Sequence, residues 1–158
     1  MPFFRSLQDS TFTDWFLGSE SVWAYPTVLT LHTVGLAILV GASIVIHLRI
    51  LRVGATVPLT RLRPLFRYIW GGFALNLVTG LVLFVTQAAD RVVDPVFCVK
   101  MGSIALALWF GVIVKRHAID RADVSLATVR RNKWLAGAAL TLWATAIVTG
   151  RLMAYLSK

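Results

Sequence analysis

Residues 27–51 read "TVLTLHTVGLAILVGASIVIHLRIL", an apolar run in which only His32, His47 and Arg49 can carry charge. A helix rises 1.5 Å per residue, so about 20 residues cross the ~30 Å hydrocarbon core of a bilayer. The run is long enough, and we predict a membrane-spanning helix over residues 26–50. The question it raises is what two imidazoles do within such a segment.

Three more apolar runs of similar length follow, over residues 68–89, 98–115 and 134–156. The chain has 158 residues, of which 58% are hydrophobic and 15% charged, and its mean hydropathy is +0.75. Soluble domains are more charged and less apolar. The links between the runs are short, which favours antiparallel neighbours. We predict an all-α integral membrane four-helix bundle, up-down-up-down, as a single transmembrane domain over residues 1–158.

The formal net charge of +9 is interpreted as a topology signal, and nucleic acid is excluded as a partner because the cations lie in loops. Eleven of the sixteen basic residues fall in the links after the first and third spans. By the positive-inside rule, both links are cytoplasmic and both termini are periplasmic. The lipid bilayer is the first expected partner, and anionic lipid would be attracted to the basic links.

The segment over residues 1–25 alternates aromatic with polar residues, which is typical of short helices lying in the membrane interface. Gly18 is a predicted helix stop, and Pro26 is compatible with the first turn of span one. Gly54, Pro58 and Pro64 predict a helix break after span one. Asp94-Pro95 predicts the turn before span three.

Two ladders of small and polar residues at four-residue spacing predict the interior faces. Span two carries Gly72, Asn76 and Gly80, and span four carries a longer ladder. Small residues let helices approach closely in lipid, and hydroxyls and amides can then bond between helices. Asn76 draws attention because an amide in mid-membrane needs a partner. The span-four ladder consists of Gly137, Thr141, Thr145 and Thr149.

Three ionisable residues are predicted to meet near the outer membrane face. His32, Lys100 and Arg151 each lie within a few residues of the outer end of a span, with Glu20 and Asp94 in the same layer. Intramembrane charges are costly and mark functional sites by default. A histidine beside two cations suits an anionic group such as haem propionates, a quinone head or a carboxylate. The alternative is that Lys100 and Arg151 only snorkel to the headgroups.

A second candidate site lies at the opposite face. His47 follows His32 by fifteen residues, which gives about 60° of rotation and ~22 Å of rise, so the two rings cannot ligate one iron. His47 and His117 end spans one and three, which lie diagonally across a bundle, and they could clamp a b-type haem. The alternative is that both are solvated imidazoles at the interface.

The lone Cys98 excludes an internal disulfide.

Three motifs resemble a bacterial family of small four-helix integral membrane proteins of unassigned function. They are "WAYPTVLTLHTVGLAILVG" (Trp23–Gly41), "DPVFCVK" (Asp94–Lys100) and "GRLMAY" (Gly150–Tyr155). A more distant likeness is to the membrane protoporphyrinogen oxidases of the HemJ type and to the copper-resistance D family, which place a histidine early in span one. The HemJ type adds a lysine early in a later span and binds haem b. His32 and Lys100 occupy comparable positions here, although "LAILVGASIV" stands in place of an aromatic-rich run.

These observations favour a multi-pass protein of the bacterial inner (cytoplasmic) membrane that binds haem b or a related redox ligand near the outer face. His32 would be the ligand of the haem iron, Lys100 and Arg151 would pair with propionates, and Asn76 would line the cofactor site. Its role would be electron transfer, with a quinone or a redox protein as partner. The protein would act as a homo-oligomer or as a subunit of a larger membrane complex. The alternatives are a cofactor-free anchor, assembly partner or small-solute carrier, and a porphyrin-modifying oxidase.

Overall fold

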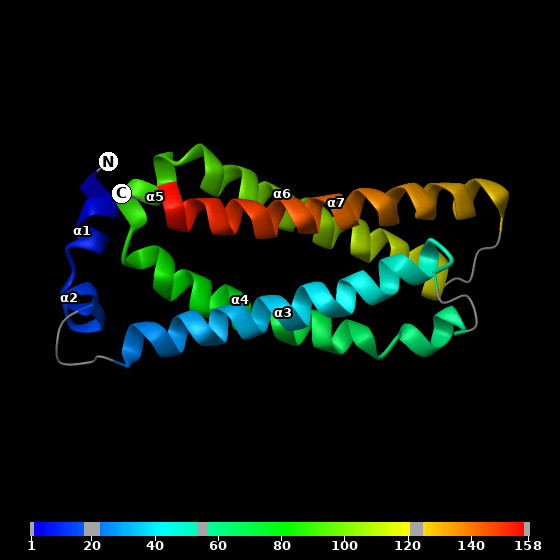
Figure 1. The fold of residues 1–158 in the computed structure, drawn as a ribbon, viewed down its shortest axis with the longest axis horizontal. Helices are drawn as coiled ribbons and strands as arrows, with labels where there is room; N and C mark the ends of the chain where they lie inside the picture. The colour runs from blue at the N-terminus through cyan, green and yellow to red at the C-terminus, as the bar shows by residue number, and fades with distance from the viewer. Residues whose placement is uncertain (1, 18–22, 54–56, 121–124, 157–158) are drawn as a thin grey trace. The chain divides into compact units, whose positions relative to one another are not determined.

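The computed structural model describes residues 2–17, 23–53, 57–120 and 125–156. All regular structure in these residues is helical (Figure 1). The α-helices are α1 (Pro2–Gln8), α2 (Thr11–Leu17), α3 (Ala24–Ile50), α4 (Leu65–Val85), α5 (Ala88–Val93), α6 (Pro95–Val114) and α7 (Leu126–Leu156). A short 3-10 helix, η1 (Leu59–Leu62), precedes α4, and a π-helical segment, η2 (Lys115–Asp120), continues α6.

Within the described residues, four helices are long and apolar enough to cross a membrane: Ala24–Ile50, Leu59–Val85, Pro95–Asp120 and Leu126–Met153. The prediction of four spans is therefore confirmed as to their number and composition, which suit a multi-pass membrane bundle. The side of the membrane on which each terminus lies stays a prediction.

Two helices have ends that differ from the approximate boundaries of the predicted spans. The second span was expected to reach residue 89, but α4 ends at Val85 and α5 is a separate helix. The apolar run continues through the turn, so hydropathy does not mark the end of the helix. The fourth span was expected from residue 134, but α7 begins at Leu126. Its first two turns carry basic residues, which form helix well yet lower the hydropathy.

Prolines stand at the predicted breaks and starts. Pro26 lies in the first turn of α3, and Pro95 opens α6. At these positions the missing N–H is one that a helix leaves unbonded in any case. Pro58 precedes η1, Pro64 precedes α4, and the predicted break between α3 and α4 is confirmed. The predicted stop at Gly18 lies outside the described residues.

Contacts divide the chain into two compact units, which are described separately. Unit 1 comprises residues 1–39 and 69–94, and unit 2 comprises residues 40–68 and 95–158. Helices α3 and α4 contribute residues to both units. The single transmembrane domain over residues 1–158 stays a prediction.

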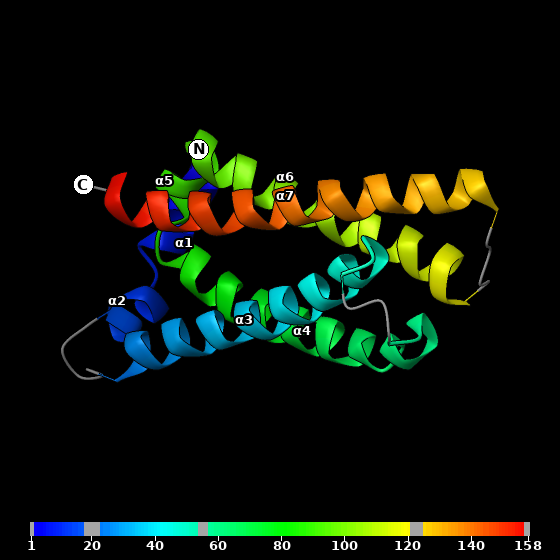
Figure 2. The same cartoon turned by 45° about the vertical axis from the view of Figure 1, so that its right-hand side comes forward.

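Unit 1 is built around a close crossing of α3 and α4, which lie against each other in both ribbon views (Figures 1 and 2). A Cβ atom added at Gly72 would lie 2.7 Å from the backbone nitrogen of Leu39 and 2.9 Å from the carbonyl oxygen of Gly35. A Cβ atom added at Gly35 would lie 2.9 Å from the backbone nitrogen of Asn76. Only glycine fits at these two positions, because the opposing atoms belong to the backbone. The predicted close packing along the span-two ladder is confirmed.

The N-terminal helices also belong to unit 1. Helix α1 packs on α5, where the Gln8 side chain accepts a bond from the Ala89 backbone N–H at 3.0 Å. In α2, the buried Phe16 stacks on Phe12 and meets Tyr25 edge-on, with ring centroids 5.9 and 6.1 Å apart. Aromatic side chains on the other faces are exposed, as in Phe3 and Trp15. These amphipathic helices suit the predicted interfacial location, which stays a prediction.

Unit 2 contains the antiparallel pair α6 and α7, which run side by side in both ribbon views (Figures 1 and 2). Helix α7 buries one stripe of side chains at a mixture of three- and four-residue spacings. The stripe comprises Thr128, Asn132, Ala136, Ala139, Trp143, Ala146, Thr149 and Met153. Mixing the two spacings keeps side chains on one face of a 3.6-residue helix, which explains why this stripe is continuous.

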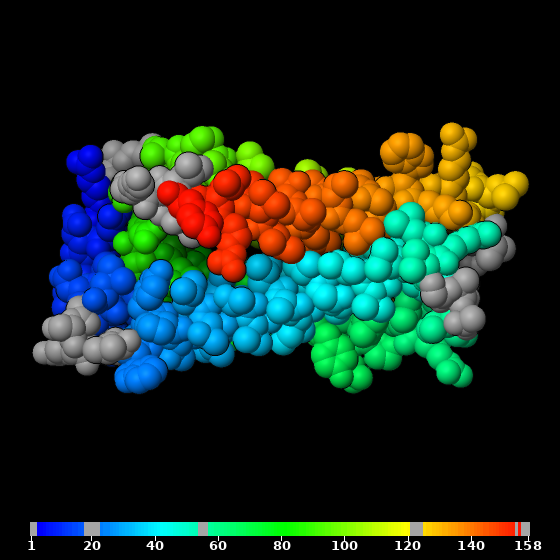
Figure 3. Space-filling view, viewed as in Figure 1, coloured from blue at the N-terminus to red at the C-terminus, as the bar shows by residue number. Residues whose placement is uncertain are grey.

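The predicted interior ladder of span four is wrong over most of its length. Thr141 is exposed, Thr145 is half-buried, and only Thr149 is buried. Each four-residue step turns about 40° round a helix, so a ladder from residue 137 to 149 drifts by about 120° and leaves the buried face. The three hydroxyls donate to carbonyls of their own helix. The outward side of α7 is visible in orange and red in the space-filling view (Figure 3).

Candidate functional site

His32 in α3 is the predicted site residue with the most defined surroundings. Its Nδ1 lies 3.1 Å from the Thr79 hydroxyl oxygen of α4, within unit 1. The Thr79 hydroxyl oxygen lies closer to the Leu75 carbonyl oxygen, at 2.7 Å, and when its single proton is donated there the oxygen accepts from Nδ1–H of His32. We assign this arrangement because the bond to Leu75 is the shorter of the two. The proton of a neutral His32 ring is therefore on Nδ1, and Nε2 carries the lone pair. A histidine whose Nδ1–H is held by a neighbour is oriented for metal ligation through Nε2.

Asn76 and Gly80 complete the surroundings of this ring. The Asn76 side-chain amide donates to the His32 backbone carbonyl oxygen at 2.8 Å. A Cβ atom added at Gly80 would lie 3.0 Å from Cε1 of His32. The partner that Asn76 required is thus the backbone of the opposing helix. Gly80 leaves room for the imidazole, and the Asn76 bond fixes the position of α3 along its axis relative to α4.

Lys100 and Arg151 both lie in unit 2, on α6 and α7. A Cβ atom added at Gly150, the residue before Arg151, would lie 3.7 Å from both Cε and Nζ of Lys100. Lys100 is half-buried and Arg151 is exposed. The Lys100 side chain therefore lies against α7 one residue before Arg151, whose side chain leaves the helix about 100° further round. The joining of His32 to this pair stays a prediction, because His32 belongs to unit 1.

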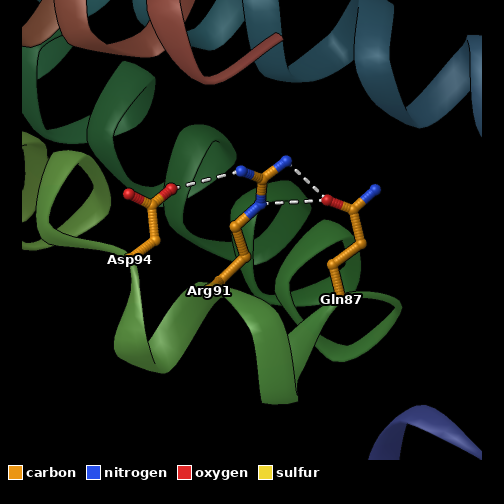
Figure 4. A network of polar contacts seen from close by, with 3 residues as sticks. All are labelled: Gln87, Arg91 and Asp94. Carbon is orange, nitrogen blue, oxygen red and sulfur yellow. Dashed lines mark hydrogen bonds and ion pairs between the residues drawn. The ribbon is translucent and has the colours of Figure 1, made fainter. Parts of the chain in front are cut away.

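Asp94, expected in the same layer, is part of a polar network at the end of α5 in unit 1 (Figure 4). The Arg91 guanidinium donates through Nε and Nη2 to the Gln87 side-chain oxygen at 2.9 and 2.6 Å. Its Nη1 lies 3.4 Å from Oδ2 of Asp94. Arg91 offsets the carboxylate charge of Asp94, so this acid is already paired within its own unit. Glu20, the other acid expected here, lies outside the described residues.

The two histidines of the alternative inner site lie in unit 2 and differ sharply. His47 is 2% exposed, and neither of its ring nitrogens makes a hydrogen bond of good geometry with a described residue. The Ser43 backbone one turn earlier is the nearest polar group, and its interaction with the ring falls short of that geometry. The solvated, interfacial interpretation of His47 is therefore wrong. His117 is half-buried in η2, and its Nδ1 lies 2.9 Å from the Ile113 carbonyl oxygen. Because a carbonyl only accepts, Nδ1 of His117 is protonated and Nε2 of the neutral ring carries the lone pair.

Some polar residues of the buried regions were missed from the sequence. Thr79 stands three residues after Asn76, on the same helical face, and this spacing could have shown it. Oδ1 of Asn132 and Nε1 of Trp143 are buried without a hydrogen-bond partner in the described residues. Asn132 was assigned to a link because it stands among basic residues. Lys115, the first residue of η2, pairs with Asp120 at 2.7 Å and lies over the Phe66 ring.

The part of the chain that the structure describes contains no group of three or more His, Cys, Asp or Glu side chains that could hold a metal ion. A haem iron takes only one or two protein ligands, so this finding leaves the haem prediction untested. Comparison of the chain with protein-family models, with curated protein sequences and with solved structures gave no match.

Proposed function

We propose that this small multi-pass membrane protein binds a b-type haem or a related redox ligand through His32 and serves in electron transfer. Its location would be the bacterial inner membrane, alone or as a subunit of a redox complex with a quinone or redox-protein partner. The apolar composition of four helices supports the membrane setting. The choice of ligand residue depends on the geometry around His32.

The observation that carries the proposal is the hydrogen bond between His32 and Thr79. It orients the imidazole and leaves the lone pair on Nε2, the nitrogen that would ligate iron. His32 is half-buried in an apolar helix, where an ionisable side chain costs free energy and is a functional candidate.

Lys100 and Arg151 would supply the cations for the propionates. Lys100 lies against Gly150, and Arg151 is the next residue of α7, which supports a positive region at one end of the α6–α7 pair. Charge-assisted bonds to carboxylates are among the strongest hydrogen bonds in proteins. When bound, the haem would supply reversible one-electron exchange. The chain's part would be to hold the iron ligand, offset the propionate charge and exclude water.

The test is an absorbance spectrum of the full-length protein purified from haem-sufficient cells, oxidised and then reduced. We expect a Soret band in the wild type, its loss in His32→Ala, and its retention in His47→Leu. Lys100→Gln should weaken haem retention. If the band were lost in His47→Leu and kept in His32→Ala, the inner site with His117 would replace the proposed one.

A cofactor-free anchor, assembly partner or solute carrier is the alternative, and one observation favours it. Asn76, Gly72 and Gly80 are all used in packing α4 on α3, as a purely structural crossing would require. A colourless wild-type preparation would support this alternative. Rescue of a strain lacking protoporphyrinogen oxidase, lost in both His32→Ala and Lys100→Ala, would instead support the porphyrin-modifying activity that the HemJ likeness implies.

A further inference from the structure

The outward face of α7 carries a groove of about 450 Å³, which lies wholly within unit 2. It is lined by Lys133, Trp134, Gly137, Ala138 and Thr141. These residues recur at three- and four-residue spacing and share one side of the helix, opposite the buried stripe. The groove exists because Gly137, Ala138 and Thr141 are small, while Lys133 and Trp134 form its larger end.

The groove crosses the point where α7 changes from charged to apolar. Arg130, Arg131 and Lys133 precede Trp134, and the run from Leu135 to Gly150 contains no charged residue. From residue 133 to 141 the helix rises about 12 Å. The groove therefore begins at the level where lipid headgroups meet hydrocarbon and continues into the apolar zone. Trp134 is 74% exposed, as expected of an interfacial tryptophan.

The charge around the groove selects its occupant. Arg130 stands one turn before Lys133 and Trp134 on the same side of α7, and α7 contains no acidic residue. Two cations at this spacing can share one phosphate. A second copy of the chain fits less well, because a symmetric contact through this face would bring the Lys133 side chains together. The apolar floor beyond Trp134 suits a hydrocarbon chain.

We infer that this groove binds one anionic phospholipid. The lipid phosphate lies at Lys133 and Arg130, the glycerol region lies beside Trp134, and one acyl chain lies on Gly137, Ala138 and Thr141. The site is independent of any haem, since its residues are separate from His32, Lys100 and Arg151. Basic residues at the membrane surface each attract anionic lipid, and here the groove adds an apolar surface on which the acyl chain can pack.

The structure offers matched variants for a test. A Cβ atom added at Gly137 has no atom within 4 Å, so Gly137→Leu fills the groove without disturbing the fold. Gly102 in α6 is equally open, and Gly102→Leu is the control for added bulk. Lys133→Gln removes the groove cation. Arg61→Gln removes an exposed cation from η1 and controls for net charge.

The experiment is native mass spectrometry of the full-length protein in detergent, titrated with dioleoyl phosphatidylglycerol or dioleoyl phosphatidylcholine. We expect one phosphatidylglycerol bound in preference to phosphatidylcholine. The apparent affinity should fall about fivefold in Lys133→Gln, the factor for one charge at an anionic surface. Gly137→Leu should lower it at least as much, while Arg61→Gln and Gly102→Leu should leave it within about twofold. Circular dichroism confirms that each variant is folded.

Three outcomes would overturn the inference. Equal binding of the two lipids would show that no anionic site exists. An equal loss in Arg61→Gln and Lys133→Gln would show that net charge, rather than the groove, attracts the lipid. A wild-type dimer that Gly137→Leu converts to a monomer would show that a second copy occupies the groove.

Discussion

The α3–α4 crossing in unit 1 and the buried stripe of α7 in unit 2 satisfy their polar groups very differently. At the crossing, the Asn76 amide and the His32 imidazole both bond to the opposing helix. In unit 2, Asn132, Trp143 and His47 each bury a polar atom without a partner in the described residues. Glycines bring the backbones of α3 and α4 close enough for side chains to reach carbonyl and hydroxyl oxygens across the contact. The alanines of α7 add a methyl group at each equivalent position.

A single methyl group at residue 72 should break the close approach and give the largest effect. In Gly72→Ala the new Cβ would meet the backbone atoms of Leu39 and Gly35 at 2.7 and 2.9 Å. Because the backbone atoms cannot rotate away as a side chain can, the two helices must separate. We expect the free energy of unfolding to fall by about 3 kcal/mol. The measurement is the free energy of unfolding in detergent, titrated with dodecyl sulfate.

Gly71→Ala is the matched control for this change, since a Cβ atom there has no atom within 4 Å. It should leave the free energy of unfolding unchanged or slightly raised, because alanine forms helix better than glycine. Equal destabilisation by the two substitutions would show that helix propensity or the membrane mimic, rather than the crossing, sets the stability.

Replacing the unpartnered histidine should act in the opposite direction. His47→Leu removes a buried imidazole that has no partner in the described residues and keeps a similar volume. We expect the free energy of unfolding to rise by about 2 kcal/mol, the penalty of leaving a buried polar group unsatisfied. His32→Leu, which breaks a formed bond, should lower it. A loss of stability in His47→Leu would mean that this ring holds a ligand, as the inner haem site requires.

Removing the Thr79 hydroxyl tests the hydrogen bond that holds His32 at the α3–α4 crossing. Thr79→Val should lower the free energy of unfolding by about 1 kcal/mol, the net value of one buried hydrogen bond. It should also release the His32 ring and weaken haem retention in the Soret assay. Thr86→Val is the control, because Thr86 is buried directly after the end of α4 and its hydroxyl bonds to the Leu83 carbonyl oxygen of α4 rather than to the other helix. A haem retention equal in both variants would contradict the positioning role of Thr79.

The smallest effect is expected along the threonine ladder of α7. The Thr145 hydroxyl donates only within its own helix, to the Thr141 carbonyl oxygen at 2.9 Å. That carbonyl is already in the helical ladder, so Thr145→Val should change the free energy of unfolding by less than about 0.5 kcal/mol. A change above 1 kcal/mol would indicate that Thr145 bonds across a helix contact, as the span-four ladder first suggested.

The parts of the fold that depend on composition and on proline could be predicted from the sequence. Twenty apolar residues have few alternatives to a spanning helix, and Pro58 and Pro64 leave no uninterrupted helix between α3 and α4. The contact through Gly72 and Asn76 was also predictable, because a ladder of three residues drifts by only about 80° round the helix.

Other features depend on three-dimensional detail that a linear pattern does not contain. The start of α7 at Leu126 was not predicted, because the basic residues in its first turns lower the hydropathy by which a span is recognised. The longer ladder ending at Thr149 was misassigned because its drift carries it off the buried face. The role of Thr79 depends on where α4 crosses α3, which the pairing of two glycines sets. The convergence of His32 with Lys100 and Arg151 is a hypothesis that the spectra of the variants address directly.

The central claim is that Thr79 holds the His32 ring with its proton on Nδ1, so that Nε2 is the ligand nitrogen. The most direct measurement is the ¹⁵N spectrum of the histidine side chains in the full-length protein, with His32 assigned through the His32→Ala variant. We predict a protonated Nδ1 and an unprotonated Nε2 for His32, and a shift of Nε2 when haem is added. A proton on Nε2, or an Nε2 signal unchanged by haem, would contradict the account.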